Sequence, residues 1–210
     1  MSDTPTVILV DDDPAMRRSV TLALELAGYR VQSFASGEKM LASLDPAQPG
    51  CLILDLRMPG MNGPEVQKTL NARGCTLPVI FISAFGDIPG TVRALKAGAV
   101  DFLEKPFSAE ALITRIEEAF AIDRCQHDER TWRERMRKRW DDLTPREAEV
   151  MRFVTEGLSN KHIGAQLNIS PRTVEKYRAR VMEKMRADSV AELCQMASSL
   201  GDPESGPNSQ

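Results

Sequence analysis

The stretch "VILVDDDPAMRRSV" at residues 7–20 joins four apolar residues directly to three adjacent carboxylates, which a proline follows. Each carboxylate makes its neighbours harder to ionise, so such a cluster is stable only when it is solvated or when a cation lies beside it. Asp13 precedes Pro14, and this pair predicts the cap and the first position of a helix. Asp11 and Asp12 are therefore the candidates for a cation site.

Short β-rich runs alternate with helical patterns through residues 1–120. The predicted strands are residues 6–10, 30–34, 51–55, 78–83 and 100–104, and the predicted helices are residues 15–28, 37–44, 63–74, 89–99 and 108–120. Strands that are continuously apolar and alternate with helices predict an α/β fold, a doubly wound five-stranded parallel sheet covered on both faces. The chemistry of such sheets gathers outside the carboxyl ends of the strands.

Polar side chains stand at four of these strand ends: Asp11 and Asp12, Asp55, Ser83 and Lys105. Three carboxylates that converge at one edge suit a hard divalent cation such as Mg²⁺. A hydroxyl and an ammonium beside them suit a phosphoryl group. Asp55 ends the most apolar strand and precedes the turn-rich "LRMPGMNG", so we predict that it is the nucleophile that attacks phosphorus.

The segment "DRCQHDERTWRERMRKRW" at residues 123–140 contains neither glycine nor proline and predicts a helix that continues the one before it. Trp132, Met136 and Trp140 recur every four residues and share one stripe of this helix. The stripe either packs onto one of the chain's own domains or forms an interface with a partner helix.

A compact helical unit follows. Thr144, Pro145 and Glu147 form the pattern of a capping box at the start of one helix. The segments "LSNKHIGAQL" and "SPRTVEKYRARVMEKM", separated by the tight turn "NIS", predict a helix-turn-helix, and "SVAELCQMASSL" predicts a fourth helix. The second helix of such a motif enters the major groove of DNA.

Residues 158–186 carry seven basic residues against two acidic ones, an island that indicates a local polyanion site. Lys176 and Arg180 lie opposite the apolar side of their helix and are the candidates for contacts to base edges. The candidates for phosphate contacts are Lys161, Arg172 and Thr173. Arg178 lies near the apolar side, so it either contacts DNA or is bound within the domain.

The composition excludes several classes. No apolar run approaches the length of a membrane span, and the N-terminus lacks the pattern of a signal peptide, so we expect a cytoplasmic protein without a membrane partner. The four cysteines lie too far apart for a zinc motif.

The motifs "VDDD", "LDLRMPGMNG", "ISAFGD" and "AVDFLEKPF" make residues 6–121 resemble the CheY-like receiver domain of two-component response regulators. The resemblance implies that Asp55 accepts phosphate from a sensor histidine kinase. It implies that Mg²⁺ is held by Asp11, Asp12, Asp55 and the backbone carbonyl of Arg57. It further implies that Ser83 and Lys105 contact the phosphoryl group, that the Lys105–Pro106 peptide is cis, and that Phe102, which lacks the hydroxyl of the more common tyrosine, is the switch aromatic.

Residues 143–185 closely resemble the LuxR-type helix-turn-helix, and the two resemblances together place the chain near the FixJ side of the NarL/FixJ group. They imply a receiver at residues 1–122, a helical linker at 123–138, a small all-α DNA-binding domain at 139–200 and a disordered tail at 201–210. The implied protein is a phosphorylation-activated transcription regulator that dimerises, binds double-stranded DNA and works with RNA polymerase. It would not be an enzyme apart from weak dephosphorylation of itself. The alternative is a receiver-controlled module that binds RNA or a protein.

Overall fold

The chain is described from a computed structural model, which covers residues 4–46, 48–84 and 101–200. The chain divides into two compact units, Met1–Asp128 and Glu129–Gln210. The predicted helix over 89–99 and the predicted tail over 201–210 lie outside the described residues. Within the described ranges, no helix has both the length and the apolar character needed to cross a membrane.

Five parallel strands form the sheet of the N-terminal unit, in the order β2-β1-β3-β4-β5. They are β1 (Thr6–Val10), β2 (Arg30–Phe34), β3 (Gly50–Asp55), β4 (Val79–Ala84) and β5 (Asp101–Lys105). Each predicted strand is found, and no end is displaced by more than one residue. The prediction of a doubly wound parallel sheet is therefore confirmed.

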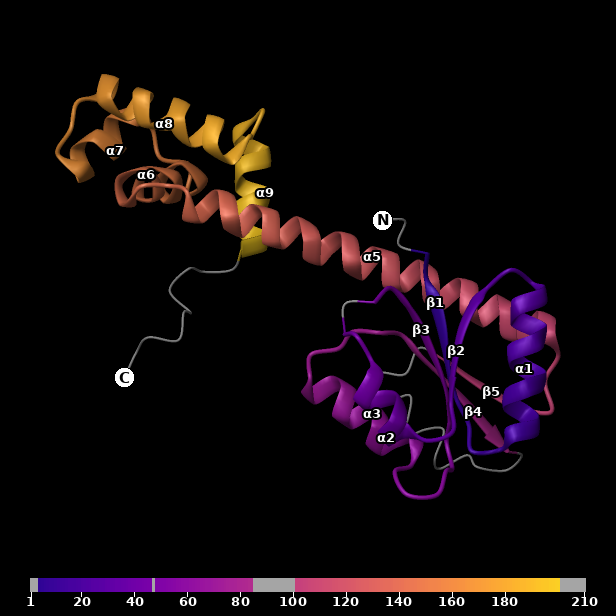
Figure 1. The fold of residues 1–210 in the computed structure, drawn as a ribbon. Helices are drawn as coiled ribbons and strands as arrows, with labels where there is room; N and C mark the ends of the chain where they lie inside the picture. Colours follow the sequence, from indigo (N-terminus) through magenta and orange to yellow (C-terminus); the bar gives the residue numbers. More distant parts are fainter. Residues whose placement is uncertain (1–3, 47, 85–100, 201–210) are drawn as a thin grey trace. The chain divides into compact units, whose positions relative to one another are not determined.

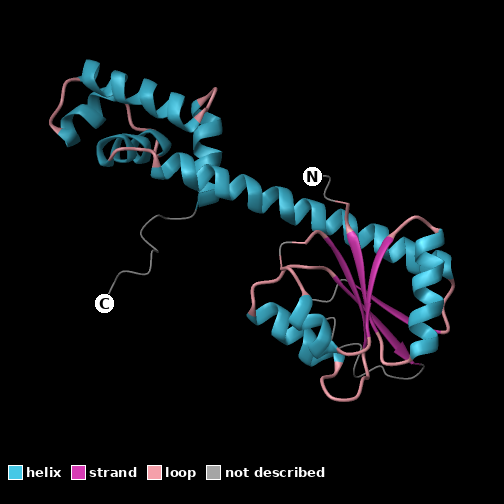
Figure 2. Cartoon of the chain, in the orientation of Figure 1, coloured by secondary structure: helices cyan, strands magenta, loops and turns pink. Residues whose placement is uncertain are grey.

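Helices cover both faces of this sheet (Figure 1, Figure 2). The structure has α1 (Pro14–Leu26) and the first turns of α5 (Ala109–Asp141) on one face, and α2 (Gly37–Ser43) and α3 (Gly63–Ala72) on the other. Leu52 and Leu54 of β3 belong to the core under α2 and α3, whereas Cys51 and Ile53 belong to the core under α1 and α5. A central strand buried on both faces needs apolar residues at every position, which is why its sequence does not alternate.

Local contacts fix the starts of the two helices that follow β1 and β3. Asp13 accepts a hydrogen bond from the backbone N–H of Ala15 at 2.8 Å, so the prediction that Asp13 caps α1 is confirmed. Gly63 begins α3, and a Cβ at this position would lie 2.6 Å from the carbonyl oxygen of Asp55 and 2.7 Å from the ring of Phe81. Only glycine lets α3 start this close to the end of β3.

Helix α5 is continuous over 33 residues, so the helical prediction for residues 123–140 is confirmed. Met136 is buried in the core of the C-terminal unit, and Trp132 and Trp140 pack against the same core. The apolar stripe therefore packs onto the chain's own domain. The predicted boundaries of the linker at 123 and 138 stay a prediction.

The C-terminal unit contains the last turns of α5, together with α6 (Pro145–Thr155), α7 (Asn160–Leu167), α8 (Pro171–Met185) and α9 (Val190–Leu200). Asn168 takes a left-handed conformation (φ 53°) at the end of α7 and makes the tight turn before α8. Ser170 caps α8 and accepts a hydrogen bond from the backbone N–H of Thr173. The predicted order of helices and turn is confirmed.

Glu147 ties α6 to α8 through an ion pair between its buried carboxylate and the half-buried Lys184. Its Oε2 atom accepts hydrogen bonds from Lys184 Nζ at 2.6 Å and from the backbone N–H of Thr144 at 2.9 Å, while its own N–H donates to Thr144 Oγ1. The predicted capping box is present. The hydrogen bond from Lys184 lowers the pKa of the Glu147 carboxyl, and burial raises it. The net pKa lies below the ordinary value of 4.5.

Replacing Glu147 by glutamine should destabilise the C-terminal unit by about 1–3 kcal/mol at neutral pH, because Lys184 loses its charged partner. A carboxyl group whose pKa is lowered by folding stabilises the folded state fully above pH 4.5, and this stabilisation is lost as the pH falls through the folded-state pKa. The stability of the variant should therefore depend less on pH in this acidic range than that of the wild type. Thermal unfolding at several pH values can be followed by tryptophan fluorescence, since Trp132 and Trp140, the only tryptophans, both lie in this unit.

Glu149→Gln is the matched control for this experiment. Glu149 is exposed and pairs with Arg146 on the surface of the same helix, where such pairs contribute little. An unchanged acid dependence in Glu147→Gln would contradict the role given to the pair of Glu147 and Lys184.

Candidate functional site

The carboxyl edge of the sheet brings Asp11, Asp55 and Lys105 into direct contact. Lys105 Nζ at the end of β5 lies 2.8 Å from Asp11 Oδ2 and 2.6 Å from Asp55 Oδ2. Asp11 is fully buried and Asp55 is 8% exposed, so one ammonium bridges two carboxylates that are almost completely removed from water. The convergence expected from the strand ends is confirmed for these three residues.

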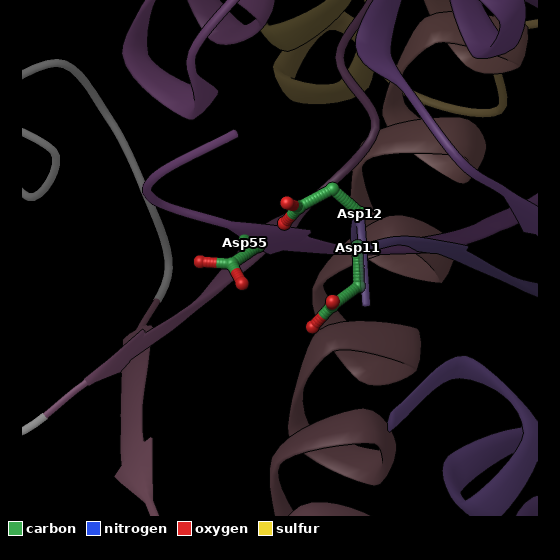
Figure 3. A group of neighbouring side chains, drawn as sticks. All are labelled: Asp11, Asp12 and Asp55. Atoms are coloured by element: carbon green, nitrogen blue, oxygen red, sulfur yellow. The ribbon is translucent and has the colours of Figure 1, made fainter. Parts of the chain in front are cut away.

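Asp12 completes a group of three carboxylates (Figure 3). Asp11, Asp12 and Asp55 each offer one oxygen, and these oxygens lie within 4.8 Å of one another. Asp12 is exposed, whereas its two neighbours are buried, so the group opens to solvent on one side. Hard carboxylate oxygens at this spacing fit a divalent cation such as Mg²⁺, which keeps part of its shell for water or phosphate oxygens.

Burial is the main influence on the ionisation of Asp55 and Lys105. Burial raises the pKa of the Asp55 carboxyl above its ordinary 3.8, and the charge of Asp11 adds to this, although hydrogen bonds from Lys105 and the Arg57 N–H oppose it. Burial lowers the pKa of Lys105, but its hydrogen bonds to Asp11 and Asp55 raise it further, and the net pKa lies above 10.5. Added positive charge would therefore stabilise the ionised form of Asp55.

Backbone contacts hold both carboxylates in place. Asp11 Oδ1 accepts the backbone N–H of Asp13 at 2.8 Å, and Asp55 Oδ1 accepts the backbone N–H of Arg57 at 3.1 Å. Arg17 Nη1 also donates to the backbone carbonyl of Asp11 at 2.6 Å. The sequence did not predict the role of Arg17, because a bond to a backbone carbonyl leaves no pattern in side-chain types.

Ser83 and Phe102 lie on the strands beside the site. Asp55 pairs with Ile82 in the register of β3 and β4, so Ser83 is the next residue along β4, and it is buried. Phe102 pairs with Phe81 and packs, half-buried, against the core under α2 and α3. The Lys105–Pro106 peptide is cis, as the resemblance implied.

The predicted DNA contacts lie on α7 and α8 of the C-terminal unit. Val174, Val181 and Met185 bury one side of α8. Arg172, Lys176 and Arg180, one turn apart on the other side, are exposed, as is Lys161 on α7. In the described part of the chain, no carboxylate pairs with any of these four cations. They are therefore available to a polyanion.

Other polar groups of the same island are bound inside the domain. Arg178 Nη1 donates to Asn160 Oδ1 at the start of α7 at 3.0 Å, so of the two alternatives for Arg178 the internal one holds. Lys184 binds Glu147. Thr173, a predicted phosphate contact, is half-buried, and its hydroxyl lies 2.8 Å from Ser170 Oγ in the cap of α8.

Two further arginines bind the ends of the helix-turn-helix helices. Arg139 Nη1 on α5 donates to the carbonyl of Met185, the last residue of α8, at 2.9 Å. Arg146 on α6 donates to the carbonyl of Leu167, the last residue of α7. Both contacts satisfy carbonyls that have no partner within their own helix. Sequence reasoning missed these roles as well, since nothing but the fold brings the helix ends near these side chains.

Comparison with known proteins agrees with this geometry. Residues 7–117 match the model of the response regulator receiver domain, and residues 141–197 match the model of bacterial regulatory proteins of the luxR family. Among curated proteins, the chain is 42% identical to nodulation protein W of Bradyrhizobium diazoefficiens, over 93% of this chain and 86% of that protein. It is also 42% identical to the transcriptional regulatory protein FixJ of Azorhizobium caulinodans, over 94% of this chain and 93% of that protein.

Solved structures show the same relationship. The response regulator StyR superimposes with a TM-score of 0.83 at 39% identity, covering 93% of this chain and 98% of that one. Full-length FixJ from B. japonicum superimposes with a TM-score of 0.58 at 40% identity, covering 94% and 97%. A receiver with an acidic pocket followed by a LuxR-type helix-turn-helix, in relatives of nearly the same length, places the chain in one family: it belongs to the two-component response regulators of the FixJ type, which act as transcription regulators.

Proposed function

We propose that Asp55 accepts a phosphoryl group from the phosphohistidine of a sensor histidine kinase and that this modification controls DNA binding. The observation that carries the proposal is the contact of Lys105 with both Asp11 and Asp55 beside the exposed Asp12. A nucleophile, an ammonium and a carboxylate group suited to a divalent cation are the parts that phosphoryl transfer to a carboxylate requires.

Each residue of the site would have a separate role in phosphoryl transfer. One Oδ atom of Asp55 would attack phosphorus as its hydrogen bond is released, the P–N bond of the donor would break, and the histidine would leave with the electron pair. Asp11, Asp12, Asp55 and the carbonyl of Arg57 would hold Mg²⁺, which neutralises charge on the phosphoryl oxygens when bound. Lys105 would then bind a phosphoryl oxygen, and Ser83 would donate its hydroxyl to another. A shift of Ser83 leaves room for Phe102 to move inward, which would alter the surface of β5.

Asp55→Asn should abolish phosphorylation by acetyl phosphate in the presence of Mg²⁺, because an amide oxygen is not a nucleophile that can form the acyl phosphate. Intact-mass spectrometry measures the addition of one phosphoryl group. The same reaction with the metal chelated by EDTA should leave the wild-type chain unlabelled.

Asp13→Asn provides the matched control. Asp13 lies in the same acidic run but caps α1, and asparagine is an equally good cap. This variant should retain labelling, and loss of label here or persistence of label in Asp55→Asn would place the acceptor elsewhere.

On the output side, we propose that α8 reads duplex DNA, with Lys176 and Arg180 at base edges and Lys161 and Arg172 at phosphates. Arg172, Lys176 and Arg180 on one side of α8 and Lys161 on α7 are exposed, and no carboxylate of the described residues pairs with them, which supports this assignment. The hydroxyl of Thr173 is engaged in the cap of α8. The N-terminal end of α8, rather than the Thr173 side chain alone, would therefore face the phosphate.

Lys176→Ala should weaken binding to a selected site by about 1–3 kcal/mol and should relax specificity at one base pair. Fluorescence anisotropy with the selected duplex and its single-base variants measures both effects. Lys161→Ala is the comparison, since loss of a phosphate contact weakens all sequences alike. A uniform loss in Lys176→Ala would reassign this residue to the backbone.

We further propose that phosphorylation drives homodimerisation through the surface around β5. β5 is one of the two edge strands of the sheet, with β2 at the other edge, and it carries Phe102. Multi-angle light scattering should show a mass near that of a dimer after treatment with acetyl phosphate and Mg²⁺, and Asp55→Asn should stay at its untreated mass. An unchanged mass for the phosphorylated wild type would instead favour release of an inhibitory contact between domains.

The remaining parts of the proposal follow from these. We expect RNA polymerase to be the downstream partner and the cytoplasm to be the site of action. We expect no turnover of an external substrate, since Arg57 stands two residues after the nucleophile, where an aspartyl-phosphate phosphatase would have an acid. Binding of RNA or of a regulatory protein is the competing outcome, and it would appear as the absence of salt-dependent binding to duplex DNA.

A further inference from the structure

The last turns of α5 carry a concentration of positive charge that the proposed DNA contacts do not use. Residues 130–139 contain six basic residues and one acidic residue. The basic residues are Arg130, Arg133, Arg135, Arg137, Lys138 and Arg139. All of them are exposed except Arg139, which is half-buried. This density exceeds that of the helix-turn-helix itself.

Packing determines which way each of these side chains faces. Trp132, Met136 and Trp140 hold one side of α5 against the core of the C-terminal unit. At about 100° per residue, the cations therefore fall on two opposite flanks of the helix. Arg133 and Arg137 lie on one flank, and Arg135 and Lys138 lie on the other.

The two flanks differ in electrostatic character. Arg133 pairs with Glu129 at 2.6 Å and Arg137 pairs with Asp141 at 3.4 Å, so acidic neighbours balance the first flank. Within the described residues, no carboxylate pairs with Arg135 or Lys138. The second flank therefore retains its charge.

A hydrogen bond joins the unbalanced flank of α5 to the C-terminal end of α8. Arg139 reaches from this flank to the carbonyl of Met185, the last residue of α8. Arg186 follows directly, is exposed, and takes a left-handed conformation (φ 54°) that normally favours glycine. Arg135 and Lys138 lie one turn and one residue before Arg139, on the helix that this bond ties to the C-terminal end of α8.

We propose that Arg135, Lys138 and Arg186, named here the α5 ridge, bind backbone phosphates of DNA outside the stretch that α8 reads. The proposal rests on duplex binding by this domain. Within the described residues these exposed cations have no acidic partner, and Arg139 ties the helix that carries two of them to α8, so their charge is available to the phosphates of a bound duplex. Such contacts position the protein and strengthen binding without reading sequence.

The test compares two double variants of the full chain. Arg135→Ala/Lys138→Ala removes two charges from the ridge, and Arg133→Ala/Arg137→Ala removes two from the balanced flank of the same helix. Affinity for a selected duplex is measured by anisotropy at several KCl concentrations. Each phosphate contact contributes about 0.9 to the slope of log affinity against log salt, so the ridge variant should lose nearly two units of slope. The control variant should keep the wild-type slope.

Duplex length gives an independent readout. The wild type should bind more tightly when the selected site is extended by about 10 base pairs on each side, one turn of DNA. The ridge variant should gain less from this extension than the control variant. Arg186→Gly should reduce the slope by about one unit while relieving the left-handed arginine.

The outcomes separate this proposal from the one it rests on. Equal slopes for the ridge and control variants would overturn the α5 ridge while leaving binding by α8 intact. Unchanged DNA binding with lost promoter activation in the ridge variant would also overturn it, and would indicate an acidic protein as the partner. If the wild type itself showed no salt-dependent duplex binding, the proposed DNA-binding function would fail instead.

Discussion

The burial of carboxylate charge at the carboxyl edge of the sheet is the constraint on which the N-terminal unit depends. Asp11 and Asp55 lose nearly all contact with water, and the single ammonium of Lys105 must serve both of them. β1 and β3 end side by side, since Val10 pairs with Leu54. Asp55 is level with Leu103 through Ile82, so Lys105 stands two residues further along β5 and its long side chain reaches both carboxylates. Burial, with a smaller contribution from the charge of Asp11, raises the pKa of Asp55 in spite of the hydrogen bond from Lys105. Added positive charge at such a site would stabilise the ionised form of Asp55.

In the C-terminal unit, arginine side chains bind polar groups at the ends of helices. Helices leave backbone carbonyls unsatisfied at their C-terminal ends, and Arg139 and Arg146 donate to the last carbonyls of α8 and α7. Arg178 on α8 donates to the side chain of Asn160 on α7. The bond of Arg139 to α8 also makes the end of α5 an integral part of the DNA-binding unit. Basic side chains in this unit thus serve two separate purposes. Some orient the reading helix, and others remain exposed with charge available to phosphate.

Sequence patterns predicted most of the framework because strand and helix periods are local properties. The five strands, the caps Asp13 and Thr144 and the helical course of residues 123–140 were all recognisable, and the strand ends predicted the meeting of Asp11, Asp55 and Lys105. The orientation of the Trp132 stripe was not decidable, since an apolar stripe looks the same whether it faces its own core or a partner. The contacts of Arg17 and Arg139 were not recognisable either, because a carbonyl acceptor imposes no residue type on its partner.

The amino-acid sequence by itself determined the fold class, the positions of the acidic cluster and the basic island, and the family. Those properties depend on periodicity, on charge and on residue types at short spacing, all of which are readable along the chain. Only the tertiary structure decided which cations are bound inside the domain and which stay exposed. It also decided that Glu147 is paired in the core and that one flank of α5 keeps its charge. These depend on distances between segments far apart in sequence, and such distances exist only once the cores of the two units have packed.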